Sequence, residues 1–245
     1  MTINGIKEKT DTAERLVKNS SWLFLAEIFS KLTALGIQII AARYLGGEGF
    51  GVFGFAFIAT GVVLDFIDNG LKVFLIRSIS RNPDLTDDYL RSIFALKWFL
   101  SFLSILIFCA VIVLFPLDHE TLKVVAIIGV ALVINGYTEM YLGVFRAFEQ
   151  MPLVSKLMIF QRILFFGFGL LVLLTGYHVV EFSAAFLISS IVSFFLARMQ
   201  LKKPRHDLKK GFDWILIRKI FNDSLPICGV VFFIFCGRTP VRKYK

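Results

Sequence analysis

Cysteine and histidine are scarce in this chain, and neither is arranged for metal or covalent chemistry. The three cysteines lie in apolar runs without the spacing of metal ligands: Cys109, Cys228 and Cys236. That pattern indicates neither a disulfide framework nor a zinc site. The sequence also shows no Ser-His-Asp or Cys-His arrangement and no glycine-rich phosphate loop of the Gly-Lys-Ser/Thr kind. We therefore expect no cofactor, no metal and no enzymatic activity.

Polar residues are a minority as well. Hydrophobic residues make up 57% of the 245-residue chain, and its mean hydropathy is +0.75. A soluble core of this size must keep a polar surface, so this composition excludes a single soluble domain. The connections between apolar runs are short and leave no room for a separate soluble catalytic domain. The composition indicates an integral membrane protein.

Apolar runs of bilayer length recur along the chain. A window of about 20 residues, the length that crosses the hydrocarbon core, finds them at 21–42, 50–71, 93–115, 122–142, 154–175 and 180–197. A shorter candidate covers 224–236. The sequence therefore predicts an all-α membrane protein of about six to seven transmembrane helices.

Basic residues gather in alternate connections between these runs. They lie before the first run, between the second and third, between the fourth and fifth, and after the sixth. Cytoplasmic loops carry the excess of Lys and Arg, so we expect a multi-pass protein of the cell's cytoplasmic membrane with a cytoplasmic amino terminus. The net charge of +9 forms no contiguous patch, which argues against nucleic acid as a partner.

The same pattern divides the chain into segments. A cytoplasmic amino-terminal segment covers 1–20, and a six-helix transmembrane bundle covers 21–197. A basic cytoplasmic connection at 198–223, a partial seventh span at 224–236 and an atypical tail at 237–245 follow. Two alternatives stand for the basic connection: an amphipathic helix on the anionic leaflet, or a solvated charged loop.

Polar side chains also occur within the predicted spans, where a charge costs about 2.5–3.5 kcal/mol on insertion scales. At about 100° per residue, the members on each span share one face of their helix. These stripes are Glu27, Lys31 and Gln38; Asp65, Asp68, Asn69 and Lys72; Asn135, Glu139 and Arg146; and Gln161 with Arg162. We expect each stripe to turn inward.

The depth of these side chains suggests a cavity. Counted at about 1.5 Å per residue, nearly all of them fall in the cytoplasmic half of the membrane, and only Gln38 lies clearly toward the outside. This distribution predicts a polar funnel that opens to the cytoplasm. A purely structural alternative stays open, in which Lys72 and the arginines snorkel to the interface and Glu27 neutralises Lys31 at i,i+4 spacing.

Asp84, Asp87 and Asp88 form a cluster of carboxylates that are candidate ligands for a metal ion. Its spacing fits a turn followed by a helix start better, with Thr86 as the cap and the carboxylates at the positive end of the helix. We predict the helix start.

The connection between the first two spans carries a more specific pattern. It reads Ala-Ala-Arg-Tyr-Leu-Gly-Gly-Glu-Gly-Phe-Gly-Val-Phe over residues 41–53. This stretch resembles the polysaccharide-exporter and O-antigen flippase branch of the multidrug/oligosaccharidyl-lipid/polysaccharide transporter superfamily. Weaker matches follow in register at residues 68–71, 77–81, 146–151 and 224–226, so the resemblance covers nearly the whole chain to about Phe235.

The resemblance implies one lobe of an inverted-V transporter bundle that moves a lipid-diphosphate-linked oligosaccharide across the cytoplasmic membrane. Membrane lipids and the lipid-linked saccharide would then be its partners. The diphosphate would be attracted by Lys31, Lys72, Arg77 and Arg146. The sugar hydroxyls or a coupling cation would be met by Asp65, Asp68, Asn135 and Glu139. Glu27 and Asn69 complete the predicted translocation set.

The end of the chain departs from the family pattern. Complete members carry a second repeat of similar size, whereas the tail at 237–245 is atypical. We expect a truncated product that retains the amino-terminal lobe, with a second lobe or protomer as a candidate partner. Two other functions stay open. One is a cation-coupled multidrug antiporter that uses Glu27, Asp65, Asp68 and Glu139, and the other is an inactive or accessory membrane module.

Overall fold

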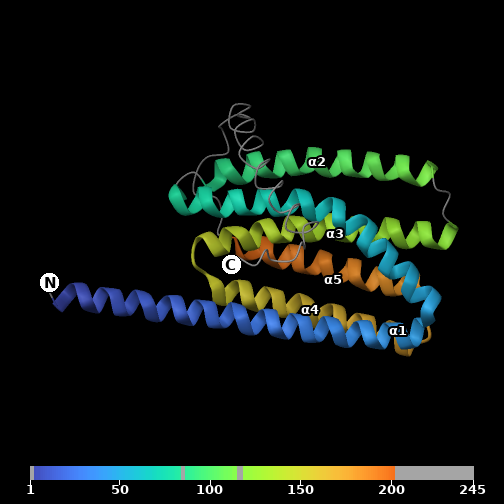
Figure 1. Cartoon of the computed structure of the whole chain (residues 1–245), viewed down its shortest axis with the longest axis horizontal. Helices are drawn as coiled ribbons and strands as arrows, with labels where there is room; N and C mark the ends of the chain where they lie inside the picture. The colour runs from blue at the N-terminus through green and yellow to red at the C-terminus, as the bar shows by residue number, and fades with distance from the viewer. Residues whose placement is uncertain (1–2, 84–85, 115–117, 202–245) are drawn as a thin grey trace, which may run out of the picture. The chain divides into compact units, whose positions relative to one another are not determined.

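The structure is a computed structural model that describes residues 3–83, 86–114 and 118–201. Within these ranges the side chains at 3–20, 63, 65–67, 69, 103–105 and 107–114 are not described. The predicted seventh span and the tail lie outside the described residues, as does the basic connection beyond Leu201. Every described element is a helix: α1 (Ile3–Arg81), α2 (Thr86–Leu114), α3 (His119–Ala147), α4 (Met151–Leu174) and α5 (Val179–Gln200) (Figure 1). The predicted all-α class is confirmed.

The helices match the predicted spans closely. Among the described residues, four segments are long and apolar enough to cross a membrane: Ser21–Val62, His119–Ala147, Met151–Leu174 and Val179–Gln200. The last three correspond to the predicted fourth, fifth and sixth spans. The first and second predicted spans both lie in α1, and the third lies in α2.

Helix α1 breaks at Gly46, in the middle of the glycine-rich connection. Gly46 has φ 72° and ψ 179°, a backbone conformation outside the helical region that glycine adopts without steric cost. The chain turns there and a new helical segment begins. Gly49 lies at the start of this segment, where an added Cβ would be 3.9 Å from Val179 Cβ of α5. The glycines thus provide the turn and the close approach.

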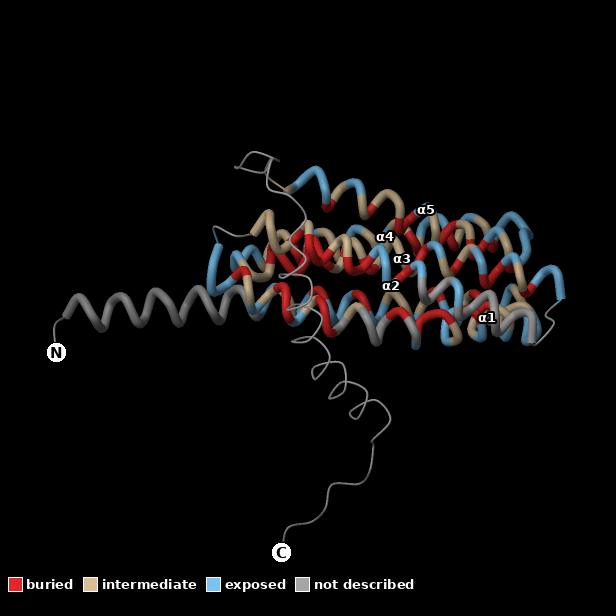
Figure 2. The backbone as a smooth tube through the Cα atoms, turned by 90° about the horizontal axis from the view of Figure 1, so that it is seen from above, coloured by how far each residue is buried: buried red, intermediate tan, exposed pale blue. Residues whose placement is uncertain are grey.

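Two compact units make up the chain. The first contains Met1–Ile58 and Leu117–Lys202, and the second contains Ala59–Pro116 and Lys203–Lys245. In the first unit α5 packs against both α3 and α4, whereas α3 and α4 make few contacts with each other. Burial follows this arrangement: 44% of the apolar window of α5 is buried, against 17% of that of α4 (Figure 2). Helix α5 is therefore the central helix of the first unit.

Small side chains allow the close packing of α5. Its buried positions include Ser183, Ala185, Ser190, Ser193 and Ala197. Small residues let helix backbones approach where lipid supplies no hydrophobic drive between helices. The Ser183 hydroxyl donates to the Val179 carbonyl at 2.8 Å, and the Ser190 hydroxyl donates to the Phe186 carbonyl at 2.9 Å. These bonds satisfy the hydroxyls within their own helix.

An aromatic cluster joins α1, α4 and α5 in the same unit. Phe182 lies 5.0 Å from Phe53 and 5.5 Å from Phe165 between ring centroids, and Phe186 lies 5.0 Å from Phe165 and 5.8 Å from Phe57. These separations are typical of favourable aromatic pairs. Beside the cluster, an added Cβ at Gly169 would lie 3.1 Å from Phe182 Cε2 and 3.3 Å from Ile37 Cδ1. Apolar packing thus holds the three helices together.

The second unit contains a helical hairpin formed by the end of α1 and by α2. Helix α1 ends at Arg81, two residues before Pro83, and α2 begins at Thr86 with Asp87 and Asp88 in its first turn. The predicted helix start is therefore confirmed. The predicted capping role of Thr86 is not, because Thr86 is the first helical residue and its hydroxyl donates to the Pro83 carbonyl. The ring centroids of Phe74 and Tyr89 lie 6.3 Å apart across the hairpin.

The ends of α3 and α4 show well-defined caps. The Asp118 carboxylate accepts a hydrogen bond from the Thr121 N–H at 3.2 Å and caps the start of α3. At the other end of α3, Glu149 adopts a positive φ of 57°, and the Gln150 N–H donates to the Phe145 carbonyl at 2.9 Å. Helix α4 ends in the same way with Gly176 at φ 77°. Glu149 therefore occupies a position that glycine usually takes.

Candidate functional site

Polar side chains of α3 and α4 meet within the first unit. We call this group the α3–α4 polar seam, and its members are Asn135, Glu139 and Arg146 on α3 and Gln161 and Arg162 on α4. The positions on α3 are four and seven residues apart, which places them on one face of the helix. Because α4 runs back after a short turn, its middle lies beside that face. The sequence predicted the stripes, and the structure brings the two together.

Glu139 and Arg146 form an ion pair along α3. Arg146 Nη1 lies 3.2 Å from Glu139 Oε2, and the side chains are 15% and 37% exposed, respectively. Arg146 Nη2 also lies 3.8 Å from Met158 Sδ on α4. The carboxylate therefore neutralises Arg146 and fixes its side chain beside α4.

Arg162 reaches the same carboxylate from α4 through a longer-range interaction. The charge of Glu139 acts favourably on the Arg162 guanidinium. Arg162 itself is half-buried and makes no hydrogen bond or ion pair with any residue in the described part of the chain. Two guanidiniums thus share one carboxylate, which leaves the seam with one excess positive charge.

Two amides complete the seam one turn before Glu139. The Gln161 side-chain amide donates to the Asn135 Oδ1. Asn135 and Gln161 are thus partners of each other, and the pair ties together α3 and α4, which make few contacts overall. A half-buried amide pair of this kind satisfies groups that lipid cannot solvate.

A second charged pair lies within the second unit. Lys97 Nζ of α2 forms an ion pair with Asp68 Oδ1 of α1. The side chains are 1% and 14% exposed, respectively, so both charges are withdrawn from solvent and lipid. Asp68 was predicted to contact substrate or a cation, and the structure shows that Lys97 neutralises it. A second function for the aspartate would require the pair to open.

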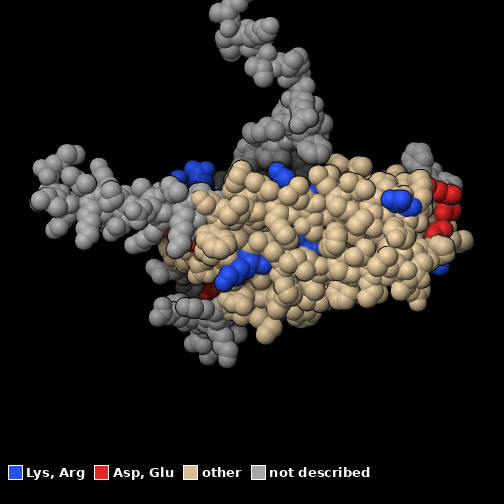
Figure 3. Space-filling view, turned by 90° about the horizontal axis from the view of Figure 1, so that it is seen from below, with Lys and Arg blue, Asp and Glu red and all other residues tan. Residues whose placement is uncertain are grey.

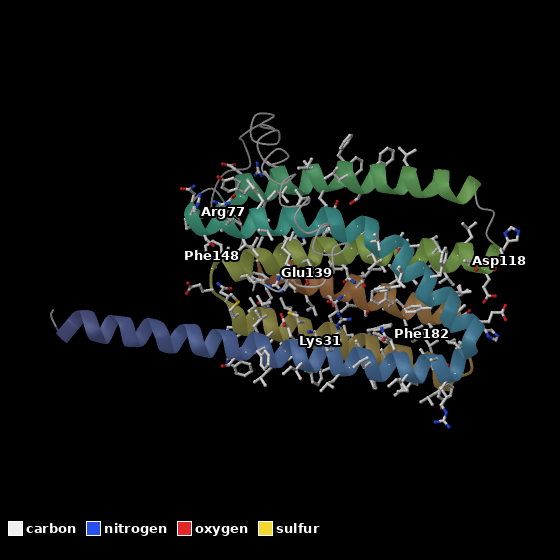
Figure 4. The ribbon with its side chains drawn as sticks, viewed as in Figure 1. Lys31, Arg77, Asp118, Glu139, Phe148 and Phe182 are labelled. Carbon is white, nitrogen blue, oxygen red and sulfur yellow. The ribbon has the colours of Figure 1, made fainter. Side chains whose placement is uncertain are left out.

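The remaining predicted site residues are more dispersed. Glu27 and Lys31 are exposed on α1 and form no ion pair with each other, so the pairing alternative is wrong for the described structure. Lys31 and Glu139 lie at a similar level along the first unit, between Phe148 near one end of α3 and Asp118 at the other (Figure 4). Gln38 is also exposed, so the helices of its own unit do not cover the α1 stripe.

Some predicted positions belong to the second unit. Arg77 is exposed near the end of α1, and Lys72 is half-buried. Asp65 and Asn69 lie on the helix, but their side chains are outside the description. The convergence of all these side chains on one cytoplasmic funnel stays a prediction.

Lys97 is the residue that sequence reasoning missed. It stands inside the predicted third span, in the sequence Leu96-Lys97-Trp98, and a lysine within an apolar window is itself a signal. The sequence could not identify Asp68 as its partner, because the pairing depends on how α2 folds back on α1.

The charged groups contrast with an apolar surface. Large apolar side chains are exposed along α1, among them Phe24, Leu32 and Ile39 at 63%, 63% and 68%. The face shown in Figure 3 is mostly free of charge, with isolated basic side chains and a group of acidic side chains at one end. Such a surface fits contact with lipid tails. Among the described residues there is no group of three or more His, Cys, Asp or Glu that would hold a metal ion.

Comparison with known proteins places these features in a family. The sequence profile described as "Polysaccharide biosynthesis protein" matches residues 16–239. No curated protein sequence matches the chain.

Solved structures show the same fold at low sequence identity. An outward-facing multidrug resistance MATE family transporter of the MOP superfamily is 17% identical, with a TM-score of 0.67 over 86% of this chain and 50% of its own. A MOP superfamily transporter from Pyrococcus furiosus, whose binding pocket is described as having reverse polarity, is 18% identical, with a TM-score of 0.67 over 87% and 50%. The P26A mutant of a MATE protein is 18% identical, with a TM-score of 0.70 over 90% and 55%. The chain thus spans about half the length of these structures.

Proposed function

The chain belongs to the polysaccharide biosynthesis protein family, and on that premise we propose that it moves a lipid-diphosphate-linked oligosaccharide across the cytoplasmic membrane. Its fold is that of a transporter, which supports movement of a cargo rather than its chemical conversion. The amino terminus lies in the cytoplasm in this proposal, as the distribution of basic residues indicates. The cargo is loaded from the cytoplasmic leaflet and released to the outer one.

One observation carries the choice of an anionic cargo. Two of the carboxylates described within the predicted spans, Glu139 and Asp68, already have basic partners in Arg146 and Lys97, whereas Glu27 is exposed on α1. Arg162 adds a further positive charge beside Glu139. The net positive charge of the seam favours a ligand that carries negative charge, and the diphosphate of a carrier lipid does so.

A drug antiporter would need a binding site with net negative charge. Organic cations require carboxylates that are free to receive them, and pairing with Arg146 or Lys97 removes that capacity. Glu27 is exposed on α1 and has no such partner, so it is the one described acidic residue of the predicted set that still fits that alternative. The likeness to MATE transporters concerns the fold.

A partner completes the transporter in this proposal. The chain corresponds to about half of each solved relative, with 50% to 55% of their length covered. The exposed stripe of Glu27, Lys31 and Gln38 would then face a second lobe or a second protomer across the translocation path, because charged side chains at this depth are costly in lipid.

Removal of the gene tests the proposal in the native cell. We expect less polysaccharide on the surface, accumulation of the lipid-diphosphate-linked precursor on the cytoplasmic side, and unchanged sensitivity to cationic drugs. Unchanged surface polysaccharide with increased drug sensitivity would instead assign the chain to drug export. No change in either measurement would leave the accessory membrane module as the answer.

A further inference from the structure

Arg162 differs from the other charged members of the α3–α4 polar seam. Glu139 and Arg146 bond each other, whereas Arg162 donates no hydrogen bond to any residue within 3–83, 86–114 and 118–201. A guanidinium carries five N–H donors, and unsatisfied donors are costly at a half-buried position in a membrane span. The donors of Arg162 are therefore available to a ligand.

Glu139 controls the charge at this position. Its carboxylate is 3.2 Å from Arg146 and attracts Arg162 across the seam. A phosphate-type anion near Arg162 would meet two guanidiniums and one carboxylate of its own sign. The guanidiniums attract it and Glu139 repels it, and both effects are strong because the surroundings have a low dielectric constant.

We propose that Arg162 is the phosphate-binding residue of the seam and that Glu139 is an internal competitor that the phosphate displaces. The identity of the phosphate as the diphosphate of a carrier lipid rests on the proposed function. The planar guanidinium suits two parallel hydrogen bonds to phosphate oxygens. While the site is empty, Glu139 holds the Arg146 side chain beside α4, so little reorganisation of Arg146 accompanies binding.

This role for Glu139 has a functional consequence. A transported ligand has to leave as well as bind, and a carboxylate that returns to the arginines favours release. The sequence-based expectation was different, because it placed Glu139 in contact with sugar hydroxyls or a coupling cation. The two roles predict opposite effects when the charge of Glu139 is removed.

Binding measurements on the purified full chain in neutral detergent separate these possibilities. The probe is geranylgeranyl diphosphate, and its dissociation constant is measured by thermophoresis for the native chain and each variant. Arg162→Gln should weaken binding of the probe at least about tenfold. Arg162→Lys should keep part of the native affinity, because lysine retains the positive charge but lacks the planar guanidinium. Glu139→Gln should tighten binding about tenfold, because the amide keeps the hydrogen-bond acceptor and loses the repulsion.

Lys156→Gln is the matched control. Lys156 lies on the same helix as Arg162 but is exposed, so its loss should leave the affinity unchanged within about twofold. Thermal unfolding of each variant identifies any loss of folded protein. Geranylgeraniol, which lacks the phosphates, should not compete, and inorganic pyrophosphate should compete weakly.

Two results would overturn the inference. Native affinity in Arg162→Gln would remove Arg162 from the site, and weaker binding in Glu139→Gln would make Glu139 a ligand contact. Phosphatidylglycerol that binds in place of geranylgeranyl diphosphate would overturn the assignment to a carrier lipid. The proposed function is tested separately, because loss of surface polysaccharide on gene removal stands whether or not Arg162 binds the probe.

Discussion

The buried pair of Lys97 and Asp68 gives the sharpest prediction about stability. Lys97 is 1% exposed and Asp68 is 14% exposed, so removing either charge breaks a buried ion pair from one side. Breaking a buried ion pair from one side costs about 3–5 kcal/mol, whereas replacing both members with neutral groups of similar size is close to neutral. We therefore expect Lys97→Met and Asp68→Asn each to destabilise the protein by about 3–5 kcal/mol, and the double variant by about 1 kcal/mol or less.

Unfolding in mixed micelles, followed by tryptophan fluorescence, measures the free energy of unfolding of the native chain, the two single variants and the double variant. The non-additivity of the double variant should amount to several kcal/mol, because the two residues contact each other. Lys123→Met is the control, since Lys123 is exposed at the start of α3 and its loss should change stability by less than about 0.5 kcal/mol. Additive single effects, or single variants as stable as the native chain, would refute the reasoning.

Three further predictions concern packing and helix ends. Gly169→Ala should destabilise the first unit by about 1–3 kcal/mol because its Cβ would lie 3.1 Å from Phe182 Cε2, whereas Gly36→Ala, with its nearest contact at 3.5 Å, should be tolerated in the same thermal assay. Glu149→Gly should raise stability by about 0.5–1 kcal/mol because glycine relieves the positive φ of 57°, and a lower melting temperature would contradict this. The hydrogen bonds from Thr121 lower the pKa of Asp118 below its ordinary 3.8, so its capping contribution is present at neutral pH and fades as the pH falls through that lowered value. Asp118→Asn should remove this pH dependence, which proteolysis of the α3 start as a function of pH would detect.

Periodicity and hydropathy were sufficient to predict where the helices lie. The predicted spans at 122–142 and 180–197 fall within α3 and α5, and the span at 154–175 exceeds α4 by one residue. The agreement follows because a bilayer requires long apolar segments, and these stand out in the composition. The connection between the spans at 21–42 and 50–71, where Gly46 breaks the helix, and the helix start at residue 86 were also predicted correctly. In both places, local backbone chemistry decides the structure.

The site was predicted only in part. Helical spacing correctly placed Asn135, Glu139 and Arg146 on one face of α3. It did not show that Gln161 would satisfy Asn135, because that pairing depends on the register of α4 against α3. The alternative in which Lys31 neutralises Glu27 is not seen among the described residues, since i,i+4 spacing permits an ion pair without requiring one.

By itself the sequence determined that the chain is helical, that it crosses a membrane and which faces of its helices are polar, because these properties depend on local composition and on the period of the helix. Only the tertiary structure decided which charges neutralise each other. Lys97 pairs with Asp68, and Glu139 pairs with Arg146 and attracts Arg162. Within the described part of the chain, Arg162 forms no hydrogen bond or ion pair. Such pairings depend on distances of a few ångströms between residues far apart in the chain, and a sequence pattern does not specify those distances.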